Sequence, residues 1–548
     1  MNTLHDIDLP AGVAAPVPNL AYALTQAARR MPDSDAVVHC ETRWTWSYFD
    51  ARVHALAAAL SDAGIGDGDV VLMHGPNCVD VLTLMYACWR AGAVWAPTNY
   101  RIVPDELRKL AAVCEPKLLV CHEDFASHAA ELDGVPTWVL SRTPREPGGQ
   151  ADVRSSFGES SIDAEIATHR DRTVAEVSPP GDTVAWYFFT SGSSGAPKVA
   201  QLTHGQLGFV VTSHLCDLMP DLRQTDATLI LAPLSHGAGV HVLPHVARGA
   251  KIVLMPTDRL DVDAAWSLVE RERVSTLFTV PTILSSLSQH PQLDRFDHGS
   301  LRYVIYAGAP ITAKDQQRAL AALGPVLVQY YGLGEVTGNI TVQPTWMHET
   351  GASAETPTAG FERTGMQIVI RDPEGHEVPP TTRGEITVCG PAVFPGYLNN
   401  PEANRRAFKH GWFWTGDMGY VDERGLLFIT GRGSDMYISG GSNIDPREIE
   451  EKLVRHPAIT AAGVVGVPDE KWGEVGVALC VSSAATALDE DTVRDWCRDK
   501  MSGYKVPKRI YFVDALPTSA YGKVTKALLL ARLDELDAPG DVPDGVSA

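Results

Sequence analysis

Short apolar runs alternate with helix-like segments from Asn19 to Gly249, and this alternation restricts the fold more than any other feature. The run Val70–Met73 predicts a buried strand, and Val79–Arg90, closed by Ala91-Gly92, predicts a helix. Further strand-like runs follow at Lys117–Cys121, Thr228–Leu231, Lys251–Met255 and Thr276–Val280. Because strands that alternate with helices form layered, largely parallel sheets, the sequence predicts an α/β domain.

The pattern changes near Thr364, where short strand-like runs are separated by turn dipeptides such as Asp372-Pro373. This change predicts a small β subdomain over about residues 364–431. Farther along, Asp445 as N-cap and Pro446 at the first helical position predict a helix that begins a second, α+β unit.

A chain of 548 residues is too long for one ordinary hydrophobic core, so more than one domain is expected. We predict an N-terminal domain over residues 1–431, a short connection at 432–435 and a C-terminal domain over 436–535. Residues 536–548, rich in Pro, Gly and Asp, are expected to form a loose tail.

The net charge of −21 argues against a general role on nucleic acid or on anionic membranes, because long-range repulsion opposes both. A polyanionic ligand would therefore need a local basic cluster. Lys505, Lys508 and Arg509 are candidates for such a cluster, with an ordinary solvated face as the alternative.

The cysteines and the N-terminus favour a cytoplasmic protein. The nine cysteines are scattered and include no CxxC pair, which predicts reduced core thiols rather than a disulfide or metal framework. Residues Met1–Pro10 contain no basic region, and no apolar run approaches the roughly 20 residues that a membrane span needs.

The most informative segment is Trp186–His204, which reads WYFFTSGSSGAPKVAQLTH. An aromatic strand leads into a loop of Ser, Thr and Gly that ends at Lys198. Small residues let backbone N–H groups converge on phosphate oxygens, while hydroxyls and a lysine add donors and positive charge. The spacing differs from that of the P-loop, GxxxxGK[ST]. The segment therefore predicts a phosphate-binding loop of another kind, with a surface turn as the alternative.

This segment resembles the signature loop of the adenylate-forming superfamily, which includes acyl-CoA synthetases, luciferases and the adenylation domains of peptide synthetases. Six further segments resemble motifs of that family in the same order. They are Pro233–Gly239, Ala307–Pro310, Tyr331–Glu335, Trp414–Asp417 with Gly431-Arg432, Ser439–Gly441 and Tyr521–Lys523. The resemblance covers about residues 20 to 530 and implies the family's fold. In that fold a small mobile C-terminal domain swings about a hinge, here residues 432–435.

The resemblance implies an acyl-CoA ligase that uses ATP, Mg²⁺ and CoA. Such an enzyme joins a carboxylic acid to AMP and then passes the acyl group to a thiol. In the first step a carboxylate attacks a phosphate, so catalysis depends on charge neutralisation and positioning rather than on a protein nucleophile.

Individual roles follow from the same resemblance. Lys523, Glu335 and His236 are assigned to catalysis, and Glu335 and Thr190 to the magnesium ion, with a packed structural histidine as the alternative for His236. The nucleotide site is expected at Thr190, Ser191, Gly192, Ser193, Ser194, Gly195, Lys198, Gly308, Ala309, Pro310, Tyr331, Gly332, Asp417 and Arg432. The acyl pocket is expected at His236, Gly239, Val240, Gly308 and Gly332. The CoA site is expected at Ser439, Gly440 and Gly441.

Three positions depart from the family's pattern. Gly334 replaces a Thr whose hydroxyl donates to the α-phosphate, Val199-Ala200 replaces Gly-Val, and Ser434 replaces the usual Lys or Asp of the hinge. The first two changes affect ATP handling, so one hypothesis is a variant that mainly converts a supplied acyl-adenylate to acyl-CoA. The alternative is an ordinary two-step ligase in which backbone N–H groups and Thr337 compensate.

Other questions stay open at this point. A stand-alone enzyme that loads a carrier protein and a binding protein without activity are alternatives, and a homodimer is one possible assembly. Acetate-type enzymes of the family often have Trp at the position of Gly332, so an acid larger than acetate is expected. The apolar setting of His236 and Val240 indicates an uncharged, hydrophobic acid.

Overall fold

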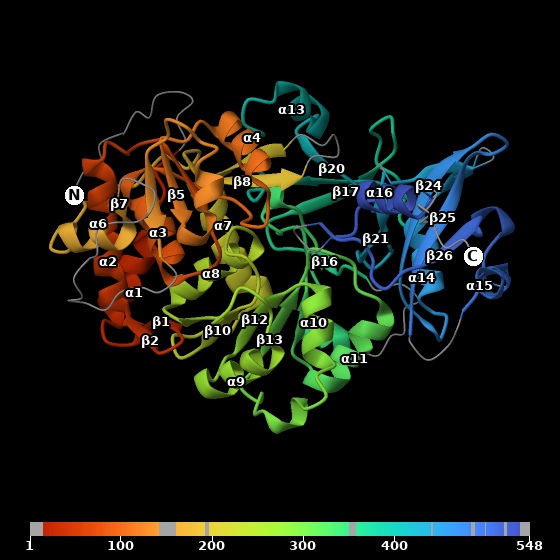
Figure 1. Cartoon of the computed structure of the whole chain (residues 1–548), viewed down its shortest axis with the longest axis horizontal. Coiled ribbons are helices and arrows are strands. Elements are labelled where there is room, and N and C mark those ends of the chain that lie inside the picture. The colour runs from red at the N-terminus through yellow and green to blue at the C-terminus, as the bar shows by residue number, and fades with distance from the viewer. Residues whose placement is uncertain are drawn as a thin grey trace, which may run out of the picture. The chain divides into compact units, whose positions relative to one another are not determined.

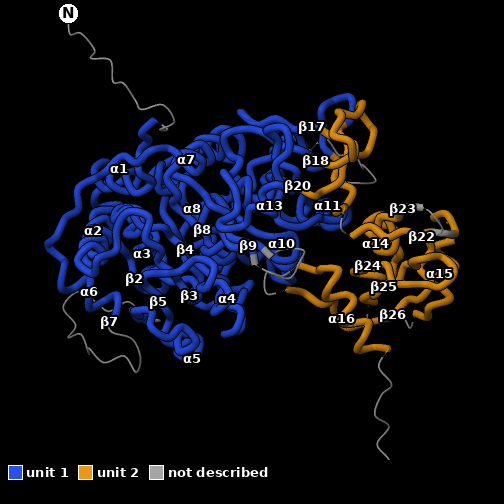
Figure 2. The backbone as a smooth tube through the Cα atoms, turned by 90° about the horizontal axis from the view of Figure 1, so that it is seen from above, with its two compact units in different colours: residues 1–369, 387–415, 422–427 blue, residues 370–386, 416–421, 428–548 orange. Residues whose placement is uncertain are grey.

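The computed structural model describes residues 15–141, 160–191, 197–349, 358–433, 435–439, 442–483, 488–498, 500–519 and 523–537. The chain divides into two compact units, which Figure 2 colours separately. Unit 1 comprises residues 1–369, 387–415 and 422–427, and unit 2 comprises residues 370–386, 416–421 and 428–548.

Unit 1 contains two seven-stranded sheets (Figure 1). In the first sheet the order is β7–β6–β5–β3–β4–β8–β9, and only the β8–β9 pair is antiparallel. Its strands are β3 (Val70–His74), β4 (Val94–Pro97), β5 (Leu118–His122), β6 (Thr137–Leu140), β7 (Ser160–Ser161), β8 (Val184–Ser191) and β9 (Pro197–Thr203). Strands β3, β4 and β5 are buried along their whole length, as is typical of parallel strands covered on both faces.

The second sheet of unit 1 has the order β14–β13–β12–β10–β11–β1–β2, and only the β1–β2 pair is antiparallel. Its strands are β1 (Asp35–His39), β2 (Thr42–Thr45), β10 (Ala227–Ile230), β11 (Lys251–Leu254), β12 (Thr276–Thr279), β13 (Tyr303–Tyr306) and β14 (Leu327–Gln329). The two sheets confirm the predicted α/β class with mostly parallel strands.

Helices cover these sheets. Trp266 of α9, Leu284 of α10 and Ala319 of α11 share one core with buried residues of β10, β12 and β13. Leu107 of α4 and Ala129 of α5 pack in the same way against the first sheet. The α-helices of unit 1 are α1 (Tyr22–Arg30), α2 (Trp46–Asp62), α3 (Val79–Ala91), α4 (Pro104–Cys114), α5 (Ala126–Ala129), α6 (Ile162–His169), α7 (His204–Ser213), α8 (Gly237–Arg248), α9 (Val262–Glu272), α10 (Pro281–Ser288), α11 (Ala313–Leu323), α12 (Thr345–Glu349) and α13 (Pro401–Ala407).

Two smaller groups of strands follow in the chain. A two-stranded sheet pairs β15 (Thr341–Val342) with β16 (Phe361–Glu362). A five-stranded sheet has the order β17–β18–β20–β19, with β21 beside β20. These strands are β17 (Gln367–Arg371), β18 (Gly384–Cys389), β19 (Phe408–Lys409), β20 (Trp412–Val421) and β21 (Leu427–Arg432). They occupy the segment in which short strands were predicted.

The C-terminal part of unit 2 is an α+β layer around a second five-stranded sheet, β23–β22–β25–β24, with β26 beside β25. Alternate residues of β24 and β25 enter two different cores, one with α14 and α15 and the other with α16. Side chains alternate across a strand, so the helices lie on opposite faces. The elements are β22 (Tyr437–Ser439), β23 (Ser442–Ile444), α14 (Pro446–Leu453), β24 (Ile459–Asp469), β25 (Gly473–Ser482), α15 (Glu490–Arg498), β26 (Arg509–Phe512) and α16 (Lys526–Asp537).

Local signals were accurate at two helix ends. Gly92 ends α3 in the left-handed region at φ 83°, and Asp445 caps α14 by accepting a hydrogen bond from the backbone N–H of Arg447. One boundary differs from the prediction. Helix α16 runs to Asp537, whose carboxylate accepts hydrogen bonds from Arg509 and Tyr511, so the first two residues of the expected tail are helical.

Nine cysteines are unpaired, and six of them are buried. Within the described ranges, no helix has the length and apolar character required to cross a membrane.

A buried ion pair joins α2 to α3 and predicts a large stability effect. Arg52 Nη2 lies 2.6 Å from Asp80 Oδ1, and their side chains are 7% and 3% exposed. Arg52→Met leaves the Asp80 carboxylate buried without its guanidinium, which we expect to cost about 3–5 kcal/mol of unfolding free energy in urea titrations. The exposed Arg170–Asp171 pair provides the control, because Asp171→Asn should change stability by less than about 0.5 kcal/mol. Equal effects of the two substitutions would contradict this assignment.

Candidate functional site

The motifs of unit 1 lie in loops that follow parallel strands. The segment 233–239 follows β10, 307–310 follows β13, and 331–335 follows β14, all in the second sheet. The carboxyl ends of parallel strands lie at one edge of a sheet, where ligands of open α/β folds bind. Motifs that are about 100 residues apart in sequence are therefore brought to the same edge.

The expected phosphate-binding loop joins two antiparallel strands of the first sheet. Thr190 in β8 pairs with Lys198 in β9, so the hydroxyl and the ammonium group lie on neighbouring strands. Gly192, Ser193, Ser194 and Gly195 lie outside the described residues. The departure at Val199-Ala200 lies within β9, where a β-branched residue suits the extended backbone.

Glu335 has a partner that the sequence did not indicate. The Tyr397 hydroxyl donates a hydrogen bond to Glu335 Oε1 at 2.8 Å, and Lys198 Nζ lies 5.1 Å from the centroid of the same tyrosine ring. Glu335 is 7% exposed, and Tyr397 is equally buried. Tyr397 forms a bridge with Ala200 of β9, which explains how a residue 62 positions away reaches this carboxylate. No spacing rule in the sequence reveals this contact.

Phe188 fills the space beside Gly334. A Cβ atom on Gly334 would lie 2.5 Å from Phe188 Cε1 and 3.3 Å from Thr190 Cγ2. The Phe188 ring also packs edge-on against His236, with ring centroids 5.4 Å apart. The Phe188 ring of β8 therefore occupies the space that a threonine side chain at position 334 would need. The hydroxyl of Thr337, proposed as a substitute donor, donates to the neighbouring carbonyl of Val336 at 2.7 Å.

Two glycines expected at the acyl pocket lie tightly against neighbouring backbone. His236 immediately precedes α8, and its Nδ1 lies 2.8 Å from Ser235 Oγ. Added Cβ atoms would lie 2.1 Å from Leu234 O at Gly239, and 2.4 Å from the Cα of Gly338 at Gly332. Val240 is buried in α8. Gly308 lies just beyond β13 with φ 83°, and Ala309 and Pro310 follow it. Tyr331 directly precedes Gly332.

Unit 2 carries the other expected site residues. Arg432 Nε donates to Asp417 Oδ1 at 3.0 Å, so the two proposed ribose ligands are adjacent on β20 and β21. Ser439 ends β22, whereas Gly440, Gly441 and the hinge residue Ser434 lie outside the described residues. Lys523 N–H donates to Ser519 Oγ at 3.3 Å just before α16.

Two of the three basic side chains at residues 505–509 form ion pairs. Lys505 Nζ lies 2.6 Å from Glu448 Oε2, and Arg509 Nη1 lies 2.9 Å from Asp537 Oδ2. These ion pairs favour the solvated-face alternative over a role in binding CoA phosphates.

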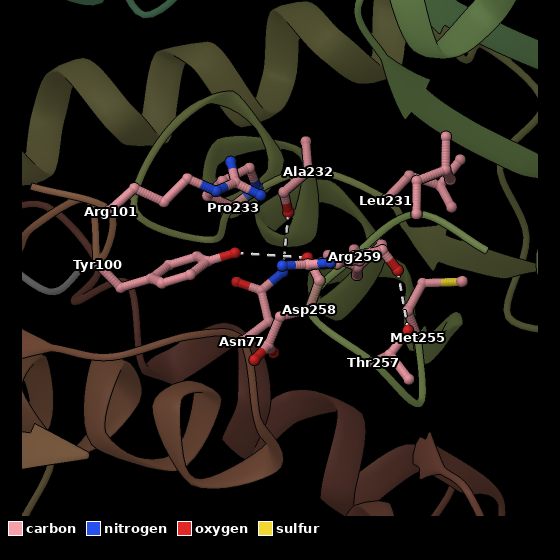
Figure 3. A pocket seen from close by; sticks show the side chains of 12 residues that line it. Asn77, Tyr100, Arg101, Leu231, Ala232, Pro233, Met255, Thr257, Asp258 and Arg259 are labelled. Atoms are coloured by element: carbon pink, nitrogen blue, oxygen red, sulfur yellow. Dashed lines mark hydrogen bonds between the residues drawn. The ribbon is translucent and has the colours of Figure 1, made fainter. Parts of the chain in front are cut away.

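A small pocket of about 40 Å³, lined by both polar and apolar residues, lies where the two sheets of unit 1 meet (Figure 3). Residues that follow β3, β4, β10 and β11 line it. Its Asn77 side chain donates to Ala232 O at 2.9 Å and accepts from Leu234 N–H at 2.8 Å. Asn77 thus ties the first sheet to the turn that presents His236. Partial burial raises the pKa of Tyr100 in this pocket.

Comparisons with known proteins identify the family. The AMP-binding enzyme family matches residues 24–398, and the AMP-binding enzyme C-terminal domain matches residues 448–523. A feruloyl-CoA synthase of Amycolatopsis sp. is 35% identical over 92% of this chain and 97% of its own length. An indoleacetate–CoA ligase of Aromatoleum aromaticum is 34% identical over 90% of this chain and 94% of its own.

Solved structures agree with this assignment. ATP-bound MatB from Rhodopseudomonas palustris superposes with a TM-score of 0.83 at 28% identity, covering 94% of this chain and 99% of MatB. The amide bond synthetase McbA from Marinactinospora thermotolerans gives a TM-score of 0.82 at 28% identity, covering 94% and 100%. The chain belongs to the AMP-binding enzyme family, in the acyl-CoA synthetase branch of the adenylate-forming enzymes. Its class is that of ATP-dependent acid–thiol ligases, which use ATP and CoA.

The contact between Phe188 and Gly334 predicts coupled substitutions. Gly334→Ala should lower the free energy of unfolding by about 1–3 kcal/mol, because its Cβ atom would overlap the Phe188 ring. The double variant Phe188→Leu/Gly334→Ala should recover most of this loss in thermal or urea unfolding. Gly208→Ala is the matched control, since nothing lies within 4 Å of its added Cβ atom in α7. A double variant no more stable than Gly334→Ala alone would contradict the steric account.

Proposed function

We propose that this enzyme forms an acyl-CoA thioester from a hydrophobic carboxylic acid larger than acetate, by way of an acyl-adenylate. The observation that carries the proposal is the grouping of Thr190 on β8, Lys198 on β9 and Glu335 after β14. The contacts of Phe188 and Tyr397 hold this grouping together. It provides a hydroxyl, an ammonium group and one buried carboxylate beside an expected phosphate-binding loop.

In the first step a carboxylate oxygen of the acid attacks the α-phosphorus of ATP, and the bond to pyrophosphate breaks. Lys198 and the loop N–H groups would hold the β- and γ-phosphates, and Lys523 would bridge the carboxylate and the α-phosphate. The lone carboxylate of Glu335, with Thr190 nearby, suits Mg²⁺, which prefers few carboxylates plus phosphate oxygens and water. When bound, this ion would neutralise phosphate charge.

In the second step the CoA thiol loses its proton, its sulfur attacks the acyl carbon, and AMP leaves. Asp417 would accept hydrogen bonds from both ribose hydroxyls, and Arg432, 3.0 Å away, would keep its carboxylate in place. We assign CoA to the face that carries Ser439, Gly440 and Gly441. A hinge at residues 432–435, between domains at 1–431 and 436–535, would present first Lys523 and then this face.

A second candidate function is supported by one contact. Phe188 occupies the side of Gly334 on which a threonine side chain would lie, so the usual donor to the α-phosphate has no space. Loss of such a donor typically costs about 2.7–4 kcal/mol of transition-state stabilisation. The enzyme would then chiefly convert a supplied acyl-adenylate to acyl-CoA. A carrier-protein thiol is the remaining alternative acceptor.

Comparison of the two half-reactions decides between these functions. ATP–pyrophosphate exchange reports adenylation, and thioester formation from synthetic acyl-adenylate reports the second step. A two-step ligase shows both at comparable rates, whereas the second candidate shows only thioester formation. In that case Phe188→Leu/Gly334→Thr should restore exchange, while Gly334→Thr alone should not, because the ring still blocks its side chain. Absence of thioester formation from every acyl-adenylate would contradict both functions.

The Tyr397 contact predicts an effect on nucleotide binding and adenylation. Tyr397→Phe removes the hydroxyl that donates to Glu335, and hydrogen bonds to charged groups contribute about 1.5–3 kcal/mol. We expect pyrophosphate exchange, or AMP binding if exchange is absent, to weaken about 10- to 100-fold. Tyr303→Phe, on β13 and away from these residues, is the control and should leave both unchanged. Unaltered nucleotide affinity in Tyr397→Phe would refute the role of Tyr397 as a positioning residue.

A further inference from the structure

Five buried side chains form a polar and aromatic cluster beside the expected acyl pocket. They come from five separate segments of unit 1 and are His214, His241, Phe278, Tyr330 and Arg363. His241 stacks on Phe278 with ring centroids 4.2 Å apart, and its Nε2 lies 3.3 Å from the Tyr330 hydroxyl. His214 continues the cluster, with its ring centroid 4.7 Å from that of His241 and its Nδ1 3.3 Å from Arg363 Nη2.

The cluster adjoins the glycines that border the acyl pocket. A Cβ atom on Gly237 would lie 2.7 Å from the Phe278 ring, and one on Gly338 would lie 2.4 Å from the Tyr330 ring. Gly338 in turn contacts Gly332. Along α8, His241 is five residues beyond His236, which corresponds to roughly 7.5 Å of helix. The cluster therefore lies directly beyond the residues at which the acyl pocket is expected.

Several buried polar atoms in and beside this cluster lack a hydrogen-bond partner among the described residues. They are His214 Nε2, His241 Nδ1, Arg363 Nε and Nη1, and both amide atoms of Asn339, which follows Gly338. Native structures leave few such atoms unsatisfied, and each calls for an explanation. By contrast, both ring nitrogens of His245, one turn farther along α8, are satisfied by His241 O and Thr276 Oγ1.

The unpartnered atoms indicate which chemical group of a ligand could form hydrogen bonds with them. Burial lowers the pKa of both His214 and His241 well below the usual value, so their rings are neutral. His214 Nδ1 lies 2.9 Å from Val210 O, to which it can donate, and 3.3 Å from Arg363 Nη2, from which it can accept, but one ring nitrogen cannot do both. Nε2 therefore needs an acceptor or a donor, according to the tautomer. Arg363 Nη1 needs an acceptor, but Asp217, 3.5 Å from Arg363 Nε, already balances its charge. A hydroxyl group supplies both a donor and an acceptor without adding charge, whereas a second carboxylate does not.

We propose that the acid is a flat ring compound with a hydroxyl group far from its carboxylate, and that His214 and His241 recognise this hydroxyl. The rings of His241 and Tyr330 each lie nearly parallel to the Phe278 ring, and the three form an aromatic wall that suits a planar ring. This inference rests on the proposed ligase function and specifies its substrate class. His214 and His241 are then specificity-determining residues.

The test compares acids that differ at one group. The purified full-length enzyme is assayed for kcat/KM with 4-hydroxycinnamate, cinnamate, 4-methoxycinnamate and 4-carboxycinnamate, with octanoate as a chain-like control. If acid activation is absent, the corresponding synthetic acyl-adenylates replace the acids. We expect 4-hydroxycinnamate to exceed cinnamate about 10- to 100-fold, and 4-carboxycinnamate to be poorest.

Two variants separate recognition from general damage. His241→Phe keeps the ring stack but removes both nitrogens, so the ratio of 4-hydroxycinnamate to cinnamate should fall toward one. His245→Gln should leave that ratio unchanged, because His245 has no unpartnered nitrogen. If His241→Phe does not fold, the ratio of kcat/KM for 4-hydroxycinnamate to that for cinnamate in the unaltered enzyme decides whether the inference stands.

The outcomes distinguish failure of the substrate inference from failure of the proposed ligase function. A ratio near one in the unaltered enzyme means that water alone satisfies the cluster, and it overturns the inference while leaving the ligase function intact. Turnover of octanoate but of none of the ring acids would also overturn the inference and leave the ligase function intact. No turnover of any acid or acyl-adenylate overturns both the inference and the proposed function.

Discussion

Parallel pairing of strands is the constraint on which the rest of the structure depends. Strands β10, β12, β13 and β14 run in the same direction, so the loops that follow them are at one edge of the second sheet. This geometry brings His236, Gly308 and Glu335 to a common edge although they belong to distant parts of the chain. Asn77 extends the arrangement to the first sheet, because its side chain holds the backbone on both sides of Pro233.

Aromatic rings packed against glycines give this edge its particular shape. Phe188 lies against Gly334, Trp186 against Gly239 and Phe278 against Gly237. Each glycine lacks a side chain on the side where a ring approaches, so neither partner can be changed alone without overlap or a void. The glycine at position 334, where the family's pattern has threonine, is therefore sterically coupled to Phe188. Its consequence for ATP handling depends on that ring.

The sequence predicted the fold class and several strands of both large sheets because apolar runs and turn residues are local signals. Gly92 and Asp445 show this well, since each ends or begins a helix through its own conformation or side chain. Contacts between distant segments had no such signal. Tyr397 reaches Glu335 only because it pairs with β9, and the His214–Arg363 contact depends on packing between elements 149 residues apart. The ion pair of Arg509 with Asp537 was missed because it requires α16 to extend into the expected tail.

The central claim is that the acid is activated by transfer of AMP from ATP to its carboxylate, and isotope transfer tests this claim most directly. The full-length enzyme is supplied with an acid labelled with ¹⁸O in both carboxylate oxygens, together with ATP and CoA, and the products are analysed by mass spectrometry. Attack of the carboxylate on the α-phosphorus leaves one labelled oxygen in AMP and one in the acyl-CoA. The account predicts one labelled oxygen in each AMP formed. Label in inorganic phosphate with formation of ADP, or acyl-CoA formation with unlabelled AMP, would contradict it.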